Sequence, residues 1–323
     1  MAPTHAPPPP SPLQSRLTDA RARTAPFLHR TPLRPSRRLG ELAGRPVYLK
    51  LDNLQRTGSF KVRGFMHKVL AHRETSDTGL LTFSSGNAAQ GLAYAAQRAG
   101  VRAVVVMTPG ANPAKVAATR GYGAEVVFAD SLEHIAATAQ ALAAREGLTL
   151  IHPYDDEELM VGHASLGLEL LEDMPPDATV VTAVGGGGMA GGLSLVAAAF
   201  GAPQRLVVVE PEGSTQMQTA LAAGRPVPVK GQTIAEGLAP PIIGSACFEL
   251  IRRRMSSLVL VSDDEIRHAM RCLLECDKML AEPSGATALA AALAGRIEDG
   301  GDGPLVVIVS GGNIDLERLR SLL

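Results

Sequence analysis

The sequence of 323 residues predicts an α/β protein of two lobes, each an open and mostly parallel sheet covered by helices. Three observations support this prediction. Segments typical of strands and of helices alternate along almost the whole chain, 46% of the residues are hydrophobic, and small glycine-containing turns follow several strand-like segments. A chain of this length can bury a large core and exceeds the usual size of one domain.

The order of the segments predicts which residues form each lobe. In the first half we expect strands at residues 47–51, 79–83, 102–107 and 125–129, and helices at 60–72, 87–99, 113–121 and 132–146. Later strands are expected at residues 179–184, 205–210, 258–261 and 305–309. If residues 47–51 pair with these later strands, a small domain of residues 54–152 is inserted into a large domain of residues 13–53 and 153–323.

The composition excludes several classes of partner. The formal net charge is −1 and the charges are interspersed, so neither a nucleic-acid surface nor an anionic membrane is indicated. No apolar run reaches the roughly 18 residues that a membrane span needs. The proline-rich residues 1–12 lack the build of a secretory signal, and we expect them to form a disordered tail. We therefore expect a cytoplasmic protein that binds a small molecule.

The three cysteines, Cys247, Cys272 and Cys276, fit a reducing compartment better than a disulfide framework. His268, Cys272 and Cys276 are spaced four residues apart, on one face of an expected helix. A tetrahedral metal site needs a fourth ligand, however, and residues 270–280 look like an ordinary buried helix. We therefore expect no metal site there.

The segment TGSFKVRG, residues 57–64, carries a lysine at an unusual position. It follows the strand at residues 47–51 and begins the next helix, so Lys61 lies in the first helical turn. The positive end of the helix dipole lowers the pKa of an ammonium group there. A neutral amine is what a Schiff base with an aldehyde requires. Most lysines are solvated surface charges, so Lys61 becomes a candidate only together with other motifs.

Four strand ends are followed by polar turns that contain glycine. The turns are SSGN at residues 84–87, GGGG at 185–188, EPEG at 210–213 and SGGN at 310–313. Glycine-rich turns also simply join strands to helices. In open α/β sheets, however, ligands bind outside the carboxyl ends of the strands, so four such turns favour one shared site.

The tetraglycine, Gly185 to Gly188, predicts an anion site. It lies between an apolar strand and a helix that begins at Met189, so successive backbone N–H groups can surround a phosphate at the positive end of the helix. The segment is not a Walker loop, because Met189 stands where that loop has its lysine.

The same region allows a different interpretation. Gly186, Gly188 and Gly191 fit the dinucleotide pattern G-x-G-x-x-G, and Glu210 ends the next strand 19 residues later, where a ribose would need an acid. A nicotinamide-dependent oxidoreductase is therefore an alternative from another class. The position of the motif in the middle of the chain, and the lack of a further nucleotide signal, count against it.

Two turns carry serine hydroxyls. Ser84 and Ser85 precede Gly86 and Asn87 at a strand-to-helix junction, where hydroxyls and free N–H groups can hold a carboxylate. An ordinary N-cap would need only one serine. Ser310 ends the last strand, where it is either a turn residue or part of the floor of the site.

An imine-forming lysine, a phosphate site, a carboxylate site and a serine at the floor of a crevice together describe pyridoxal phosphate holding an amino acid. The segments GSFKVRG, SSGN, GGGG, EPSGA and SGGN, at residues 58–64, 84–87, 185–188, 282–286 and 310–313, resemble those of the fold-type II pyridoxal phosphate enzymes. The sequence is most similar to the serine/threonine dehydratase and serine racemase group, from about residue 26 to residue 318. This resemblance implies a fold like that of the tryptophan synthase β subunit.

The resemblance implies a role for each matching residue. Lys61 is expected to be catalytic and to bind the cofactor covalently, and Ser85 is expected to protonate the opposite face of the α-carbon. Phe60 is expected to pack on the cofactor ring, Asn87 to bond its 3-hydroxyl and Ser310 to meet its nitrogen. The complete cofactor-binding set is Phe60, Lys61, Asn87, Gly185, Gly186, Gly187, Gly188, Met189 and Ser310. The substrate-binding set is Ser84, Ser85, Asn87 and Ala88.

The resemblance also implies the reaction. We expect an ammonia-lyase that removes water and ammonia from threonine, serine or a bulkier β-hydroxy amino acid and leaves a 2-oxo acid. A serine at the ring nitrogen leaves the ring largely neutral, which favours prompt elimination. Serine racemisation or β-replacement on the same cofactor is the alternative, and some racemisation is expected through Ser85. Relatives suggest a homodimer, and because the sequence ends at Leu323 we expect no regulation through a C-terminal regulatory domain.

The sequence departs from the family pattern at three places. Ala88 and Ala89 stand where relatives usually have a histidine, so we expect space for a bulky substrate. His163-Ala164-Ser165 stands where relatives often read Gln-Gly-Thr. Gln216 replaces an aspartate of the metal-using members, so Glu210 is only a weak candidate metal ligand and no tight cation site is expected.

Overall fold

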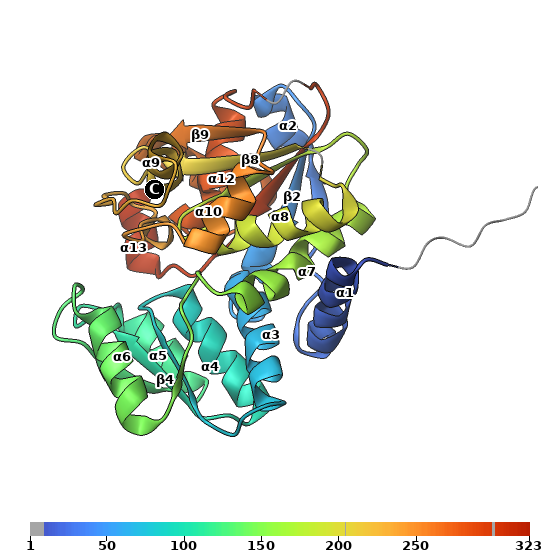
Figure 1. Ribbon diagram of the computed structural model, residues 1–323. Helices are drawn as coiled ribbons and strands as arrows, with labels where there is room; N and C mark the ends of the chain where they lie inside the picture. Colours follow the sequence, from blue (N-terminus) through green and yellow to red (C-terminus); the bar gives the residue numbers. More distant parts are fainter. Residues whose placement is uncertain (1–9, 204, 299–300) are drawn as a thin grey trace, which may run out of the picture.

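The computed structural model describes residues 10–203, 205–298 and 301–323, which form two sheets with helices around them (Figure 1). In spatial order, the larger sheet contains β1 (Leu33–Ser36), β2 (Val47–Leu51), β10 (Leu305–Val309), β7 (Thr179–Ala183), β8 (Arg205–Pro211) and β9 (Ser257–Val261). The smaller sheet contains β5 (Glu125–Phe128), β4 (Ala103–Met107), β3 (Leu80–Phe83) and β6 (Thr149–Leu150). Among the described strands only the pair β1 and β2 is antiparallel, so the predicted fold class is confirmed.

The helices in the described part of the chain cover both faces of the sheets. They are α1 (Pro12–Thr24), α2 (Arg37–Ala43), α3 (Lys61–Arg73), α4 (Asn87–Ala99), α5 (Pro113–Gly121), α6 (Ile135–Glu146), α7 (Glu157–Asp173), α8 (Gly188–Phe200), α9 (Gln216–Ala223), α10 (Ser245–Arg252), α11 (Asp263–Cys272), α12 (Pro283–Leu293) and α13 (Leu316–Leu322). None of them is long and apolar enough to cross a bilayer.

The central strands are apolar throughout because both of their faces are buried. On β7, Val181 contributes to the core cluster that includes residues of α12, whereas its neighbour Val180 contributes to the cluster of α7 and α8. In the smaller sheet, Val105 of β4 lies in the core cluster of α3 and α4, whereas Val104 lies with residues of α6. Successive strand residues point to opposite faces, so a fully apolar strand requires a layer of helices on each side.

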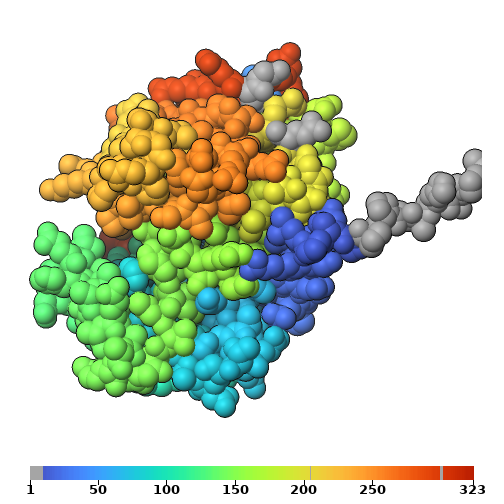
Figure 2. Space-filling model, in the orientation of Figure 1, coloured from blue at the N-terminus to red at the C-terminus, as the bar shows by residue number. Residues whose placement is uncertain are grey.

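The chain leaves the larger sheet after β2 and returns to it at β7. β2 pairs in parallel with β10, with Val47 opposite Leu305, so the pairing required for an insertion is present. The smaller sheet is built entirely between these two crossings. In the space-filling view, the surface is hollowed between the green and the orange parts of the chain (Figure 2). The exact domain boundaries at residues 54 and 153 stay a prediction.

Two predictions about secondary structure are wrong. The predicted tail extends too far, because Ser11 caps α1, which already begins at Pro12; residues 1–9 lie outside the described part. Residues 270–280 do not form one ordinary helix, because α11 passes into a π-helical turn at Leu273–Asp277 and Lys278 has a left-handed φ of 58°. The described residues contain no group of three or more His, Cys, Asp or Glu side chains that could hold a metal ion.

A buried cluster of four charges joins α3 to the larger sheet and to α7. The guanidinium of Arg63 donates to Asp52 Oδ2 at 2.7 Å and to Glu169 Oε1 at 2.7 Å. Lys50 of β2 donates to the other oxygen of Glu169 at 2.5 Å. All four side chains are almost completely inaccessible to solvent. Two positive and two negative charges satisfy one another, which is the condition under which charges can be buried.

Replacing Arg63 with leucine should lower the free energy of unfolding by about 3–5 kcal/mol, because Asp52 and Glu169 would stay buried without their main partner. Urea unfolding measures this change. The control is Arg37→Leu, which removes an exposed pair with Glu41 and should change the free energy by less than about 1 kcal/mol. Equal effects of the two substitutions would contradict a structural role for the cluster.

Candidate active site

The segment TGSFKVRG and the turn SGGN lie side by side at the carboxyl end of β10. The N–H group of Phe60 donates to the carbonyl of Ser310 at 3.0 Å, and the N–H group of Gly312 donates to the carbonyl of Gly58 at 2.9 Å. Gly58 has a φ of +72°, and a Cβ there would lie 2.3 Å from the side chain of Asn313. The start of α3 is therefore fixed directly against the turn that follows β10.

Lys61 is the first residue of α3 and so lies in its first turn, as the sequence predicts. Its Nζ donates to the carbonyl of Pro153 at 2.9 Å and lies 5.3 Å from the centroid of the Phe60 ring. Burial lowers the pKa of Lys61 to about 8. Burial, and not the helix dipole on which the sequence argument relied, is the largest cause of this shift. A substantial fraction of this amine is neutral near pH 8, as attack on an aldehyde requires.

The tetraglycine joins β7 to α8 in a conformation that requires glycine. Gly187 has a φ of +95°, a region that side chains rarely adopt. A Cβ on Gly186 would lie 2.3 Å from the ring of Tyr154. α8 begins at Gly188, so the turn presents backbone N–H groups at the positive end of a helix, as an anion site does. Met189 follows inside α8, with its side chain buried in the core.

Residues 153 and 154 bring the lysine to the tetraglycine. Pro153 holds the amine of Lys61 through its carbonyl, and the ring of the next residue, Tyr154, lies against Gly186. A Cβ on Gly188 would lie 3.4 Å from the carbonyl oxygen of Tyr154. The predicted imine-forming lysine and the predicted phosphate-binding glycines therefore lie in one place.

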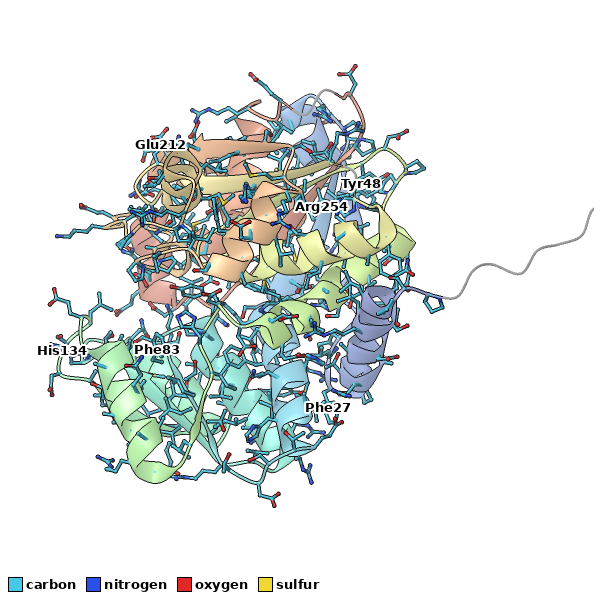
Figure 3. The ribbon with its side chains drawn as sticks, in the orientation of Figure 1. Phe27, Tyr48, Phe83, His134, Glu212 and Arg254 are labelled. Carbon is cyan, nitrogen blue, oxygen red and sulfur yellow. The ribbon has the colours of Figure 1, made fainter. Side chains whose placement is uncertain are left out.

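Three rings connect the smaller sheet to the tetraglycine. Phe83, labelled in Figure 3 on the side of the smaller sheet that faces the larger one, meets His152 edge-on at 5.3 Å between centroids. His152 in turn meets Tyr154 edge-on at 4.5 Å. None of these rings is among the predicted site residues. The sequence could have indicated two of them, because Phe83 ends β3 and His152 follows β6 closely, at the carboxyl ends of strands where ligands bind.

Asn87 begins α4 and joins two other motifs. Its Nδ2 donates to Glu282 Oε1 at 2.5 Å, and its Oδ1 accepts a hydrogen bond from Asn313 at 2.8 Å. Burial raises the pKa of Glu282 to about 7. The sequence did not indicate this carboxyl as a functional group, because nothing local shows that it meets a residue 195 positions away.

The serine pair is held by local hydrogen bonds. The hydroxyl of Ser84 accepts from the N–H group of Gly86 at 3.1 Å. The hydroxyl of Ser85 accepts from the N–H group of Thr108 at 3.0 Å and lies 3.0 Å from the Thr108 hydroxyl. Thr108 was not among the predicted site residues. Its position directly after β4 could have indicated it, because ligands bind at the carboxyl ends of strands. Both serines remain partly exposed, so they can meet a ligand.

The remaining predicted residues are more deeply buried. The hydroxyl of Ser310, at the end of β10, lies 3.4 Å from the carbonyl of Ser284, a long contact. Ala88 and Ala89 lie in the core cluster of α3 and α4, and Ala88 is 4% exposed. The small side chains at these two positions therefore belong to the buried first turn of α4.

Glu210, the weak candidate metal ligand, caps a helix in this structure. It accepts hydrogen bonds from the N–H groups of Met217 at 2.6 Å and Gln218 at 3.0 Å, and so caps α9. Burial raises the pKa of Glu210 to about 7. Gln216 donates to Ser214 at 2.8 Å and to the carbonyl of Pro240. The two groups serve the local packing of the segment after β8.

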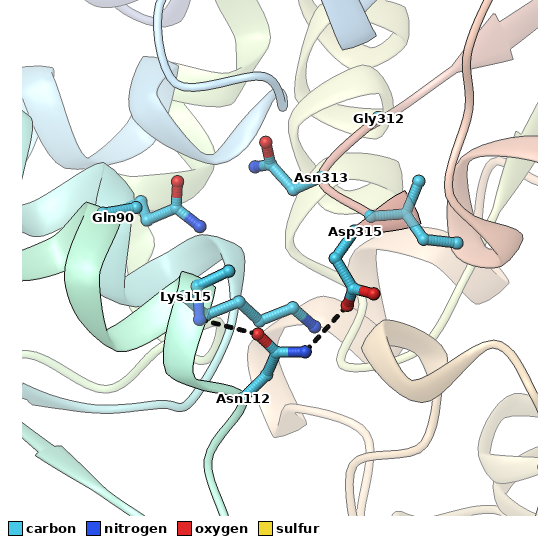
Figure 4. Close-up of a pocket in the computed structure, with 9 residues that line it drawn as sticks. Gln90, Asn112, Lys115, Gly312, Asn313 and Asp315 are labelled. Carbon is cyan, nitrogen blue, oxygen red and sulfur yellow. Dashed lines mark hydrogen bonds between the residues drawn. The ribbon is translucent and has the colours of Figure 1, made fainter. Parts of the chain in front are cut away.

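A cavity of about 190 Å³ adjoins this site (Figure 4). Gln90 of α4 and Asn112 line it on one side, and Asn313 and Asp315 line it on the other. Asn112 donates to Asp315 at 2.8 Å, one of the dashed lines in Figure 4. Asn313, which lines the cavity, also donates to Asn87 at the start of α4.

The comparisons with known proteins agree with this geometry. The family model described as pyridoxal-phosphate dependent enzyme matches residues 24–311. The chain is 36% identical over 300 residues to the L-threonine ammonia-lyase of Thermotoga maritima, an alignment that covers 92% of this chain and 74% of that protein. It superimposes on the T.th. threonine deaminase with a TM-score of 0.86 at 39% identity, over 94% of this chain and 98% of the other. For maize serine racemase the TM-score is 0.88 at 32% identity, over 95% of each chain.

The residues present fit pyridoxal phosphate. The partly neutral amine of Lys61 suits its aldehyde, and the glycine turn at the start of α8 suits its phosphate. The resemblance inferred from the sequence is confirmed. The nicotinamide alternative is wrong, because the glycines on which it rested belong to a chain that matches the pyridoxal-phosphate family. This protein belongs to the family of pyridoxal-phosphate dependent enzymes.

Proposed function

We propose that this enzyme removes water and ammonia from a β-hydroxy amino acid, with L-threonine and L-serine as candidates, and releases a 2-oxo acid. The observation that carries the proposal is the amine of Lys61, whose pKa is about 8 and which is held at Pro153 beside the tetraglycine. The names of the relatives, threonine ammonia-lyase and threonine deaminase, support the same reaction.

Each residue of the site has a proposed task. When bound, pyridoxal phosphate supplies an electron sink that makes the α-proton of an amino acid acidic. Lys61 accepts that proton as the general base. The hydroxyls of Ser84 and Ser85, with Asn87, bind the substrate carboxylate at the positive end of α4. The tetraglycine would hold the phosphate, and the hydroxyl of Ser310 would bond to the ring nitrogen without protonating it.

The net reaction needs no further reactant. Elimination of the β-hydroxyl releases one water, and hydrolysis of the carbon–nitrogen bond then consumes one water. The net products are therefore one 2-oxo acid and one ammonia. Association into a homodimer and a cytoplasmic location stay predictions.

Replacing Lys61 with alanine should abolish covalent attachment of the cofactor and lower 2-oxo acid release by at least about 10³-fold. Borohydride treatment followed by mass measurement detects the attachment. The matched control is Lys68→Ala on the same helix, because Lys68 pairs with Asp156 at 2.8 Å and should be dispensable for attachment. Retention of the borohydride-fixed mass in the Lys61 variant would refute the assignment.

The two alanines after Asn87 lead to a proposal about substrate size. Replacing Ala88 with histidine should lower the ratio of kcat/KM for threonine or phenylserine over that for serine by about 10-fold, because a larger side chain beside Asn87 would leave less volume for a bulky substrate. Ala88→Ser is the matched control, since it adds a polar group with little volume. A wild-type enzyme that turns over serine as well as or better than threonine and phenylserine would contradict the proposal.

Racemisation is the second candidate activity. It is favoured by the structural likeness to maize serine racemase and by the position of Ser85, whose hydroxyl is oriented by Thr108. Ser85→Ala should reduce racemisation of serine by about 10-fold or more while elimination falls less. Ser84→Ala, the control, should weaken both reactions together through the carboxylate. Normal racemisation in the Ser85 variant, measured by chiral chromatography, would remove Ser85 from this role.

A further inference from the structure

His163 occupies the meeting point of the two helices that bear the lysine and the tetraglycine. It lies on α7 and is almost completely buried. Its ring lies 4.9 Å from that of Phe60, between centroids. A Cβ on Gly64 of α3 would lie 2.5 Å from the ring, and a Cβ on Gly188 of α8 would lie 3.5 Å from it. Glycine at position 64 is therefore what admits the imidazole.

The hydrogen bonding of His163 defines its tautomer. Nδ1 accepts a hydrogen bond from the N–H group of Gly64 at 3.1 Å, so Nδ1 carries no proton. Burial, together with the positive charges of Lys61 and Arg63, holds the pKa of His163 well below its usual value. The neutral ring must then carry its one proton on Nε2.

This Nε2–H group has no partner within the described part of the protein, although it is buried. Burying a donor without an acceptor is unfavourable, so proteins rarely keep one without a ligand or a water. Nε2 would lie 3.7 Å from a Cβ on Gly188, the residue at which the tetraglycine becomes α8. The free donor therefore lies next to the proposed anion site.

We propose that the Nε2–H group of His163 donates a hydrogen bond to the phosphate of pyridoxal phosphate, as a side-chain complement to the backbone N–H groups of the tetraglycine. The inference rests on the cofactor that the proposed function uses. The contact needs no proton uptake, because a neutral imidazole already presents the donor. The hydrogen bond from Gly64 keeps the ring in this tautomer and so makes the start of α3 part of the phosphate site.

A comparison of two ligands tests the proposal. The cofactor-free protein is titrated with pyridoxal phosphate and with pyridoxal, which has the same aldehyde but no phosphate. His163→Leu should weaken binding of pyridoxal phosphate by about 10-fold or more, as loss of a charge-assisted hydrogen bond predicts, and should change pyridoxal binding less than about twofold. His163→Gln, which keeps a donor, should retain affinity within about threefold of the wild type.

Equal losses for both ligands in His163→Leu would overturn the proposal and leave a packing role. A second measurement uses only the wild-type protein, and so is independent of whether the variants fold. The ¹⁵N resonance of His163 Nε2 should move on addition of pyridoxal phosphate and not on addition of pyridoxal, and an unchanged resonance would overturn the contact. A protein that binds the cofactor in this way but releases no 2-oxo acid would refute the proposed function alone.

Discussion

The position of the reactive amine depends on the buried charges around Arg63. Residues two apart on a helix point to nearly opposite sides, so fixing Arg63 toward β2 and α7 directs Lys61 away from them. The guanidinium is held by Asp52 on one side and Glu169 on the other, and this arrangement prevents rotation of the first turn of α3. The amine then meets the carbonyl of Pro153, next to the tetraglycine.

Lys50 and Lys61 are both buried, but their surroundings give Lys50 a structural role and Lys61 a chemical one. Lys50 and Lys61 both have lowered pKa values, and burial is the largest cause for each. Lys50 donates to the carboxylate of Glu169, so its charge is part of a balanced cluster. Lys61 donates instead to an uncharged carbonyl, and no carboxylate among the described residues raises its pKa. Lys61 is therefore the one of the two whose neutral form is accessible for chemistry.

The sequence predicted the features that depend on the local pattern of residues. The strands after residue 79 and the glycine turns follow from alternation and turn composition, so these predictions were close to the observed elements. The partners of the site could not be predicted, because they arise from contacts between distant segments. Thr108 meets Ser85 across two neighbouring strands, and Glu282 meets Asn87 across the two sheets. His163 stood out from the sequence only as a departure, since its free Nε2 becomes visible when α3 and α8 are in place.

The two sheets meet at the site through amides and carboxylates. Asn87 and Asn112, at the starts of α4 and α5, bond to Asn313 and Asp315 in the segment after β10, each at 2.8 Å. Polar contacts of this kind contribute modest net free energy, because water competes for the same groups. The core cluster of α12 and the core cluster of α3 and α4 are separate from each other, and Leu159 of α7 packs into the latter. A ligand that bonds to the start of α4 while its other end is held at the tetraglycine would add further contacts across this polar junction, so that ligand binding and alignment of the two units stabilise each other.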